Sequence, residues 1–346
     1  MSISLAIKYR PTTWDDVTEQ GSTKQILRQQ LETNTFKHAY LFCGPAGCGK
    51  TTCARIFAND INNGEGNPIE LDAASHNGVD DARNLIQQSK TKSLDSEYKV
   101  FIIDECHALS SSAWQAMLKI IEEPPAKSIF IFCTTDPQKI PATILSRVQR
   151  YDFQRISLDG IVHRLKQILH DENIYVTTKD IEVISSSVEY IAKIADGGMR
   201  DAITLLDKCL SYSKILTLEN VVKALETANY DDMFKLLSFV LRCSVADIIQ
   251  FVEQLYASGV DLRQFSTMFM EFVIEVLKYV LNCDWRYINI PKFYEDELQK
   301  VADYDGLINL LTTLVKLNND LKYSVTPKYD VESALILEVA FSDRTN

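Results

Sequence analysis

The sequence has no apolar run that approaches the roughly 18 residues required to span a membrane. Residues 1–11 lack the charge-then-apolar order of a signal peptide, so a cytoplasmic protein is expected. None of the eight cysteines forms a C-x-x-C pair and the five histidines show no ligand spacing, so reduced, mostly buried thiols are expected rather than a metal cluster. Internal repeats and low-complexity tracts are absent as well.

Positive charge is outnumbered by negative charge, with 36 Lys and Arg against 47 Asp and Glu. The 346 residues carry a net charge of −11, but residues 1–155 hold 17 Lys/Arg against 18 Asp/Glu, whereas the remainder holds 19 against 29. A general attraction to nucleic acid is therefore not indicated, and any DNA contact must be a local feature of the first half. The length suggests two or three domains, and the hydrophobic fraction of 46% is that of an ordinary globular protein.

What the sequence does contain is a phosphate loop. An apolar run leads into the pattern G-x-x-x-x-G-K-T, followed by a helical pattern, and the loop consists of Gly44, Pro45, Ala46, Gly47, Cys48, Gly49, Lys50, Thr51 and Thr52. Glycines let backbone N–H groups curl around phosphates, and the helix N-terminus favours negative charge. Lys50 is expected to reach the β- and γ-phosphates, and the Thr51 hydroxyl is expected to ligate Mg²⁺.

Two adjacent carboxylates end a second apolar run. Asp104 and Glu105 follow Val100–Ile103. Asp104 would complete the Mg²⁺ site directly or through water, and Glu105 would orient and deprotonate a water for attack on the γ-phosphate. Alone, a phosphate-loop pattern can arise by chance, and a strand that ends in two carboxylates is often only solvated. Both motifs, in strand context and in this order, predict a nucleotide triphosphatase site, with His107 in a packing or supporting role.

Apolar strands alternate with amphipathic helices in the first half. The expected strands are Ala39–Cys43, Ile69–Asp72, Val100–Ile103, Ile129–Cys133 and Arg150–Phe153, and the expected helices are Ser22–Leu31, Thr51–Asn59, Val79–Lys90 and Ser112–Ile121. This alternation predicts an α/β domain over residues 1–155, with a parallel sheet covered on both faces. Ligands bind such sheets at the carboxyl ends of the strands, where both motifs lie.

Strand signals vanish after residue 157. The expected helices are 161–172, 181–195, 200–210, 218–226, 233–240, 244–257, 262–281, 305–321 and 331–341. A shift near residues 228–230 separates a small helical domain over 156–226 from an all-α domain over 227–346. The stretch 263–280 is strongly apolar and rich in Phe and Met, so it is either a buried bundle helix or an oligomer interface.

Several further strings are specific. They are Tyr9-Arg10-Pro11 with Trp14-Asp15-Asp16-Val17, His38–Phe42, Leu71–Asp80, Glu122-Glu123-Pro124-Pro125, Thr134–Pro141, Ser146-Arg147, Asp196–Ala202 and 327–340. On these strings the chain resembles the AAA+ ATPase subunits of DNA polymerase sliding-clamp loaders, most closely the bacterial DNA polymerase III tau/gamma branch. The resemblance covers nearly the whole chain. It implies a P-loop ATPase domain (1–155), a helical lid (156–226) and a helical collar for oligomerisation (227–346).

The resemblance also assigns roles outside the two motifs. Arg147 would be an arginine finger on the γ-phosphate of the next subunit, worth roughly 10³–10⁵ in rate, and a plain surface arginine is the alternative. Arg200 would be the sensor through which the lid detects the nucleotide, and otherwise it would pair with Asp196 or Asp201. Thr135 would position the water or the γ-phosphate, with Thr134 as the alternative if the register differs by one.

Two groups of binding residues follow from the same resemblance. The adenine-side contacts would be Arg10, Pro11 and Val17, and the DNA contacts would be Ser75, Asn77, Gly78 and Arg83. The helix N-terminus after Gly78 would grip a DNA phosphate, and Arg83 would touch the same strand. An N-cap and a turn explain this pattern equally well.

Two departures from the family pattern matter. The bacterial subunit inserts a four-cysteine zinc module before the strand that ends at Asp72, but residues 61–68 here contain no cysteine, so no zinc is expected. The chain also stops after the collar, without the C-terminal region through which the long form engages helicase and polymerase. A short loader subunit fits, either of a bacterial cell or encoded by a virus.

The resulting hypothesis is an ATP-driven clamp-loader motor. With ATP and Mg²⁺, a homo- or hetero-pentamer of subunits would open a sliding clamp, and primer–template DNA would trigger hydrolysis and release. One rival is another DNA-processing ATPase, such as a helicase loader or branch-migration motor, which the helical collar disfavours. The other is a structural loader subunit without ATPase activity. This alternative is disfavoured by the intact set of Lys50, Thr51, Asp104 and Glu105.

Overall fold

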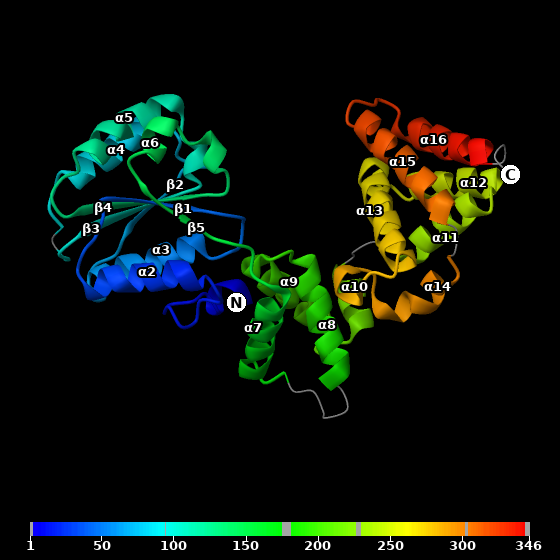
Figure 1. The fold of residues 1–346 in the computed structure, drawn as a ribbon, viewed down its shortest axis with the longest axis horizontal. Coiled ribbons are helices and arrows are strands. Elements are labelled where there is room, and N and C mark those ends of the chain that lie inside the picture. The colour runs from blue at the N-terminus through cyan, green and yellow to red at the C-terminus, as the bar shows by residue number, and fades with distance from the viewer. Residues whose placement is uncertain (1–2, 94, 175–180, 226–229, 302–303, 343–346) are drawn as a thin grey trace. The chain divides into compact units, whose positions relative to one another are not determined.

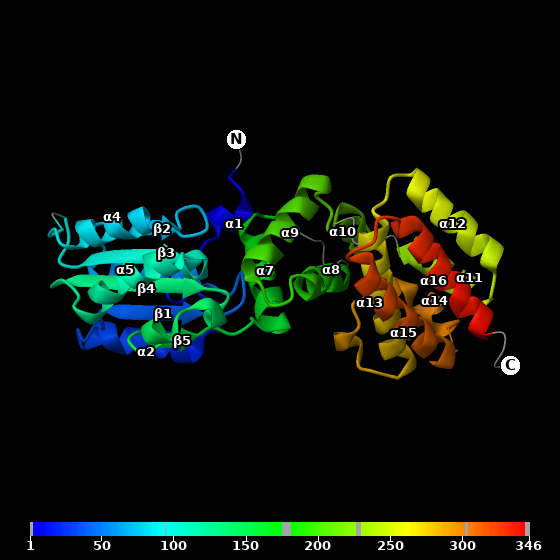
Figure 2. The same cartoon turned by 90° about the horizontal axis from the view of Figure 1, so that it is seen from above.

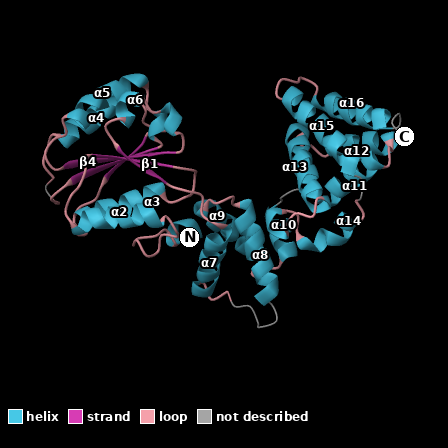
Figure 3. Ribbon diagram, in the orientation of Figure 1, coloured by secondary structure: helices cyan, strands magenta, loops and turns pink. Residues whose placement is uncertain are grey.

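The computed structural model describes residues 3–93, 95–174, 181–225, 230–301 and 304–342 (Figure 1). The chain divides into two compact units, Met1–Val221 and Val222–Asn346. Within the described residues, all strands belong to the first unit, and the second unit has helices as its regular elements (Figure 3). No described helix combines the length and apolarity needed to cross a bilayer.

Five parallel strands form one sheet in the order β2-β3-β4-β1-β5. They are β1 (Ala39–Cys43), β2 (Ile69–Asp72), β3 (Lys99–Asp104), β4 (Ser128–Thr134) and β5 (Gln149–Asp152). Every residue of β1 and β4 is buried, as expected for strands that are covered on both faces. The predicted parallel sheet is confirmed, and the fifth strand begins and ends one residue earlier than predicted.

Helices cover both faces of this sheet (Figures 1 and 2). The helices of the first unit are α1 (Leu5–Lys8), α2 (Gly21–Glu32), α3 (Lys50–Ile61), α4 (Val79–Ser89), α5 (Ser111–Glu122), α6 (Ala142–Leu145), α7 (Leu158–Asp171), α8 (Ile181–Ile194), α9 (Met199–Tyr212) and α10 (Leu218–Leu225), which crosses the division. α2 and α3 pack on the face that carries Tyr40 and Phe42. α4 and α5 pack on the opposite face, which carries Leu41 and Phe130. Successive residues of one strand point to opposite faces, so β1 contributes to both cores.

The parallel register brings the functional strand ends to one edge of the sheet. Asp72 aligns with Asp104, and Cys43 aligns with Thr134. The phosphate loop follows β1 directly, and Glu105 follows β3 directly. Both sequence motifs therefore lie at the carboxyl edge, which is where ligands bind in folds of this kind.

The second unit is a helical bundle. It consists of α11 (Tyr230–Leu241), α12 (Val245–Ala257), α13 (Leu262–Val280), α14 (Glu295–Gln299), α15 (Tyr304–Leu321) and α16 (Pro327–Ser342). Phe265, Phe269 and Phe272 of α13 lie in its core with residues of the other long helices. Burial within the bundle therefore accounts for this apolar face, and a role in oligomerisation stays a prediction.

Candidate nucleotide site

Glycines shape the loop that joins β1 to α3. Gly44, Gly47 and Gly49 have φ values of +150°, +70° and +100°. A Cβ on Gly44 would lie 2.4 Å from the carbonyl oxygen of Phe153, and a Cβ on Gly47 would lie 2.9 Å from the Cα of Gly198. Both collisions are with backbone, so no side-chain rotation could relieve them, and glycine is required at these two positions.

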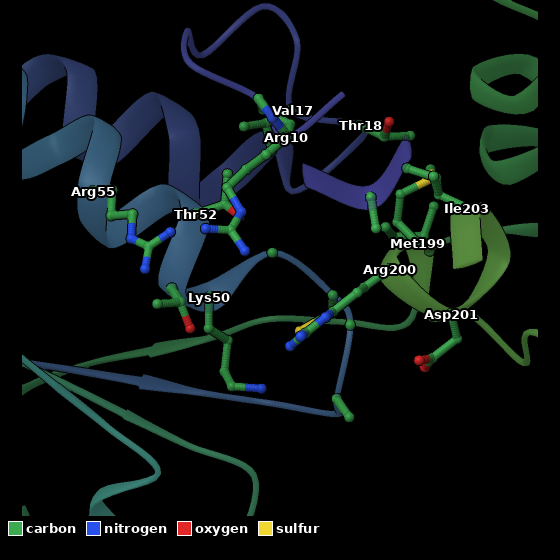
Figure 4. A pocket seen from close by; sticks show the side chains of 18 of the residues that line it. Arg10, Val17, Thr18, Lys50, Thr52, Arg55, Met199, Arg200, Asp201 and Ile203 are labelled. Atoms are coloured by element: carbon green, nitrogen blue, oxygen red, sulfur yellow. The ribbon is translucent and has the colours of Figure 1, made fainter. Parts of the chain in front are cut away.

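Lys50 is the first residue of α3, and its side chain lies along the loop (Figure 4). The residue is only 6% exposed, and its Nζ donates hydrogen bonds to the carbonyl oxygens of Gly44 (2.8 Å) and Pro45 (2.7 Å). The N-terminal end of α3 adds the partial positive charge of its backbone N–H groups. The loop thus combines a buried cation with a helix N-terminus, an arrangement that suits phosphate.

The two predicted metal ligands meet at the edge of the sheet. Thr51 Oγ1 donates a hydrogen bond of 2.8 Å to Asp104 Oδ2. A hydroxyl and a carboxylate are hard oxygen donors, and Mg²⁺ is usually bound by one or two such protein groups together with water and phosphate oxygens. The residues present therefore fit a magnesium ion.

Glu105 is fixed at the end of β3 by its neighbours. Its backbone is left-handed, with φ of +46°, and its N–H donates to Asp104 Oδ1 at 3.0 Å. Its Oε2 accepts a hydrogen bond from Thr135 Oγ1 at 3.2 Å and lies 3.2 Å from Nδ1 of His107. Thr134 is fully buried and lies 3.1 Å from the same His107 nitrogen. Of the two candidate threonines, Thr135 is the one that contacts the carboxylate.

A cavity of about 530 Å³ adjoins these groups. Among its lining residues are these predicted site residues: Arg10, Pro11, Val17, Ala46, Gly47, Cys48, Gly49, Lys50, Thr51, Thr52, Asp104, Glu105 and Arg200. Gly44, Pro45, Thr135 and Arg147 do not line it. The sequence interpretation missed Arg55, although its place one turn after Thr51 on α3 was a usable signal.

Cations gather around this cavity. Figure 4 shows Arg10, Lys50, Arg55 and Arg200 projecting toward a shared space. Burial lowers the pKa of Arg10, and the charges of Arg55 and Arg200 lower it further. Arg55 is neutralised by two hydrogen bonds to Glu70, at 2.7 and 2.6 Å. A cluster of like charges is unfavourable alone and is relieved by an anionic ligand.

Arg200 itself has no hydrogen-bonding or ion-pair partner for its guanidinium within the described ranges of the chain. The expected alternative was a pair with Asp196 or Asp201. Asp196 instead pairs with Arg155. Arg200 is the second residue of α9 and lines the cavity, so the lid contributes a cation to the site.

The N-terminal segment beside the cavity is tied to the lid. Tyr9 Oη and Lys8 Nζ each donate a hydrogen bond of 2.6 Å to Glu172 Oε1, just after α7. The hydrogen bond from Lys8 is the larger cause, and that from Tyr9 the smaller, of a lowered pKa of Glu172. The pKa of Tyr9 is raised, mainly by burial and also by its hydrogen bond to Glu172. Arg164 of α7 lines the cavity and donates to the Tyr9 carbonyl oxygen at 3.4 Å. Three hydrogen bonds therefore join the segment that carries Arg10 to α7 and to the residue that follows it.

Arg147 lies after α6, away from this cavity. Its side chain is 37% exposed, and its Nε is 2.7 Å from Glu122 Oε1. An exposed arginine outside its own nucleotide cavity is accessible to another molecule.

The predicted DNA contacts surround the start of α4. The turn before the helix contains Ser75, Asn77 and Gly78. Asp81 accepts a hydrogen bond of 3.2 Å from the Gly78 N–H and so caps the helix. Arg83 is exposed and pairs with Asp80 at 3.1 Å. The start of α4 is therefore capped by a residue of its own first turn, and the DNA-binding role stays a prediction.

The cysteines are free thiols. Burial raises the pKa of Cys43 to about 11 and that of Cys53 to about 12. Residues 62–68, between α3 and β2, contain no cysteine. The expected absence of zinc stays a prediction, which elemental analysis of the purified protein tests.

The sheet order, the phosphate loop after β1, the carboxylates after β3 and the arginine of the lid define the AAA+ class of P-loop ATPases. The fold is similar to the solved structure of RuvB from Thermotoga maritima, with a TM-score of 0.53 and 19% sequence identity, over 73% of this chain and 86% of that one. At this identity the likeness concerns the fold alone.

Sequence comparisons are more specific. Residues 19–78 and 68–157 match the family described as DNA polymerase III, delta subunit, and residues 160–215 match the DNA polymerase III clamp loader subunit, ATPase lid domain. The DNA polymerase III subunit tau of Bacillus subtilis is 34% identical over 354 residues, covering 95% of this chain and 62% of its own. Protein STICHEL of Arabidopsis thaliana is 32% identical over 348 residues, covering 93% and 28%.

The chain belongs to the clamp-loader ATPase family of DNA polymerase III subunits. The resemblance inferred from the sequence strings is thereby confirmed. The chain spans less than two thirds of the length of the two curated relatives just described.

Proposed function

We propose that this chain is the ATP-hydrolysing motor subunit of a DNA polymerase sliding-clamp loader. The observation that carries the proposal is the Thr51–Asp104 hydrogen bond beside Glu105, at a cavity that Arg200 of the lid also lines. The motor uses ATP to open a sliding clamp and to place it on primer–template DNA. It acts in the cytoplasm within a homo- or hetero-pentamer of loader subunits.

Binding is the task of the phosphate loop and its surroundings. Lys50 and the loop N–H groups hold the β- and γ-phosphates, and Arg10, Pro11 and Val17 flank the adenine. Mg²⁺ held by Thr51 and Asp104 would neutralise charge on the phosphate oxygens. The fit of these two oxygen ligands supports the metal assignment.

Glu105 is the general base. It accepts the proton of the attacking water, and the Thr135 hydroxyl fixes the orientation of its carboxylate. Arg200 carries the state of the nucleotide to the lid. Arg147 of the neighbouring subunit stabilises the charge that develops as the γ-phosphoryl group departs. No chain supplies its own Arg147, so hydrolysis requires assembly.

The three-domain division belongs to the same proposal: a P-loop domain over 1–155, a lid over 156–226 and a collar over 227–346. The start of α4 would contact DNA phosphate through Ser75, Asn77, Gly78 and Arg83. The exposure of Arg83 supports this contact, while Asp80 and Asp81 in the first turn oppose it electrostatically.

Two rival functions share the fold. One is another DNA-processing ATPase, such as a helicase loader or branch-migration motor, and the other is a structural loader subunit that would keep the assembly surfaces without hydrolysis. The complete set of Lys50, Thr51, Asp104 and Glu105 disfavours the structural subunit, and the lid match to clamp loaders disfavours the branch-migration motor.

Mass measurement separates these functions. Light scattering after gel filtration would give the mass of the chain alone and mixed with candidate partner subunits and a sliding clamp, with and without ATP. A loader forms an ATP-dependent complex with the clamp, and primer–template DNA then accelerates phosphate release. Hydrolysis stimulated by four-way junction DNA, without clamp binding, would contradict the proposal.

A further inference from the structure

A carboxylate holds the guanidinium of Arg147. Its Nε lies 2.7 Å from Glu122 Oε1. Its Nη1 donates to the carbonyl oxygen of Thr143 at 2.6 Å and to Ser146 Oγ at 3.0 Å. The two oxygen acceptors engage Nη1, and the Glu122 carboxylate forms an ion pair with the Nε side of the guanidinium. No bond of Nη2 occurs within the part of the chain that the structure describes.

Glu122 is carried by a rigid element. It is the last residue of α5, whose other face is buried in the core through Trp114, Met117, Ile120 and Ile121. A carboxylate at a helix C-terminus opposes the helix dipole, so its position is unfavourable to the helix itself. At this position, however, the carboxylate lies beside Arg147, which follows α6.

We infer that Glu122 is the positioning residue of the arginine finger, and this inference rests on the proposed role of Arg147. A free arginine side chain must lose much rotamer freedom when it docks on a phosphate. Glu122, with the two oxygen acceptors on Nη1, removes that freedom before the neighbouring subunit arrives. The Nη2 group keeps both of its hydrogens for the γ-phosphate, which a guanidinium binds with directional hydrogen bonds.

An ion pair of this kind can also hold an arginine away from its phosphate. If Glu122 competed with the phosphate for Arg147, removing the carboxylate would raise hydrolysis. If it positions the guanidinium, removing it lowers hydrolysis. The sign of the effect therefore decides between the two.

The test uses the complete loader assembly that contains this chain, with primer–template DNA, and measures ATP hydrolysis against ATP concentration. Glu122→Ala is expected to lower the stimulated kcat by roughly tenfold to a hundredfold, the loss caused by a misplaced catalytic group, with KM for ATP unchanged. Glu122→Gln, which keeps the size of the side chain but removes its charge, is expected to lower kcat as well, because the contact with Nε is an ion pair. Glu123→Ala, the neighbouring exposed carboxylate, is the matched control and leaves the rate unchanged.

Combination with Arg147→Ala separates positioning from a structural role. A positioning residue has nothing to position in that background, so the double variant is no slower than Arg147→Ala alone. An equal further loss in the double variant would show that Glu122 acts through the fold and would overturn the inference. Faster hydrolysis by Glu122→Ala would overturn it as well.

Failure of the wider proposal has a different signature. If Arg147→Ala itself leaves stimulated hydrolysis intact, the finger assignment fails and this inference fails with it. If Arg147→Ala loses hydrolysis while Glu122→Ala does not, only the positioning role fails. In the isolated chain, NMR should also detect faster exchange of the Arg147 Nε–H in Glu122→Ala than in Glu123→Ala, and equal exchange rates would contradict the inference.

Discussion

Thr135, just beyond β4, donates a hydrogen bond of 3.2 Å to the carboxylate of Glu105, just beyond β3. The two strands are neighbours in the sheet, so the orientation of the Glu105 side chain depends on the register between them. The orientation of Glu105, the proposed general base, therefore depends on the neighbouring strand β4 as well as on its own strand.

Nucleotide binding and turnover should separate by mutation. Lys50→Ala should abolish productive nucleotide binding, because Lys50 is the buried cation of the phosphate loop. Glu105→Gln should bind ATP normally and lose roughly 10²–10⁴ in kcat, because it acts on the attacking water. Filter binding and phosphate release measure the two properties, with the exposed Lys119→Ala as a control. Normal turnover by Glu105→Gln would remove Glu105 from the catalytic role.

Arg147 should act between subunits. Arg147→Ala should keep ATP affinity in the isolated chain, since the residue lies outside the cavity, and should lose DNA- and clamp-stimulated hydrolysis in the assembly. Mixtures of Arg147→Ala and Lys50→Ala chains should regain activity at junctions where an intact Lys50 meets an intact Arg147. Equal loss of hydrolysis in dilute monomer and in the assembly would show that Arg147 acts within its own chain.

Arg83 offers a test of the DNA contact. Arg83→Ala should weaken binding to primer–template DNA and reduce the slope of log affinity against log salt by about 1, because one phosphate contact is lost. Asp80→Asn should strengthen binding, since Asp80 now pairs with Arg83. Fluorescence anisotropy at several salt concentrations measures both, with Arg28→Ala on α2 as the control. An unchanged slope in Arg83→Ala would exclude the contact.

Thiol reactivity should follow burial. At pH 7.5 iodoacetamide should label the exposed Cys283 well before Cys43. The pKa of Cys43 is raised to about 11, above the ordinary value of about 8.5, so its thiolate fraction is lower at every pH below 11 and rises about tenfold per pH unit. Peptide mass spectrometry between pH 7 and 9 measures the rates, and Cys283→Ser should remove the fast phase. Equal labelling of Cys43 and Cys283 would contradict the burial described here.

The sheet could be predicted almost completely from the sequence. β1 and β4 are buried on both faces, so each forms an uninterrupted apolar run with sharp ends. The four-residue α1 was not predicted, because no periodic pattern fits so short a helix. Its position depends on packing against α9 and on a hydrogen bond of 3.1 Å from Leu5 N–H to Asp207.

The candidate site, too, could be predicted from the sequence only in part. The phosphate loop and Asp104-Glu105 are contiguous strings whose chemistry can be recognised locally. The pairs Tyr9–Glu172 and Glu122–Arg147 join residues that are distant in sequence, and their side chains carry no local pattern. Such pairs become visible only when the packing of whole helices is known.

The strand that carries the phosphate loop is made long before its neighbours. β1 pairs only with β4 and β5 among the described strands, and these begin at Ser128 and Gln149. At about 5–20 residues per second, the ribosome leaves β1 without a partner for on the order of 5–20 seconds. During synthesis the nascent chain therefore exposes an apolar strand to chaperones and to other nascent chains, and the site is complete only after Arg200 of the lid has been made as well.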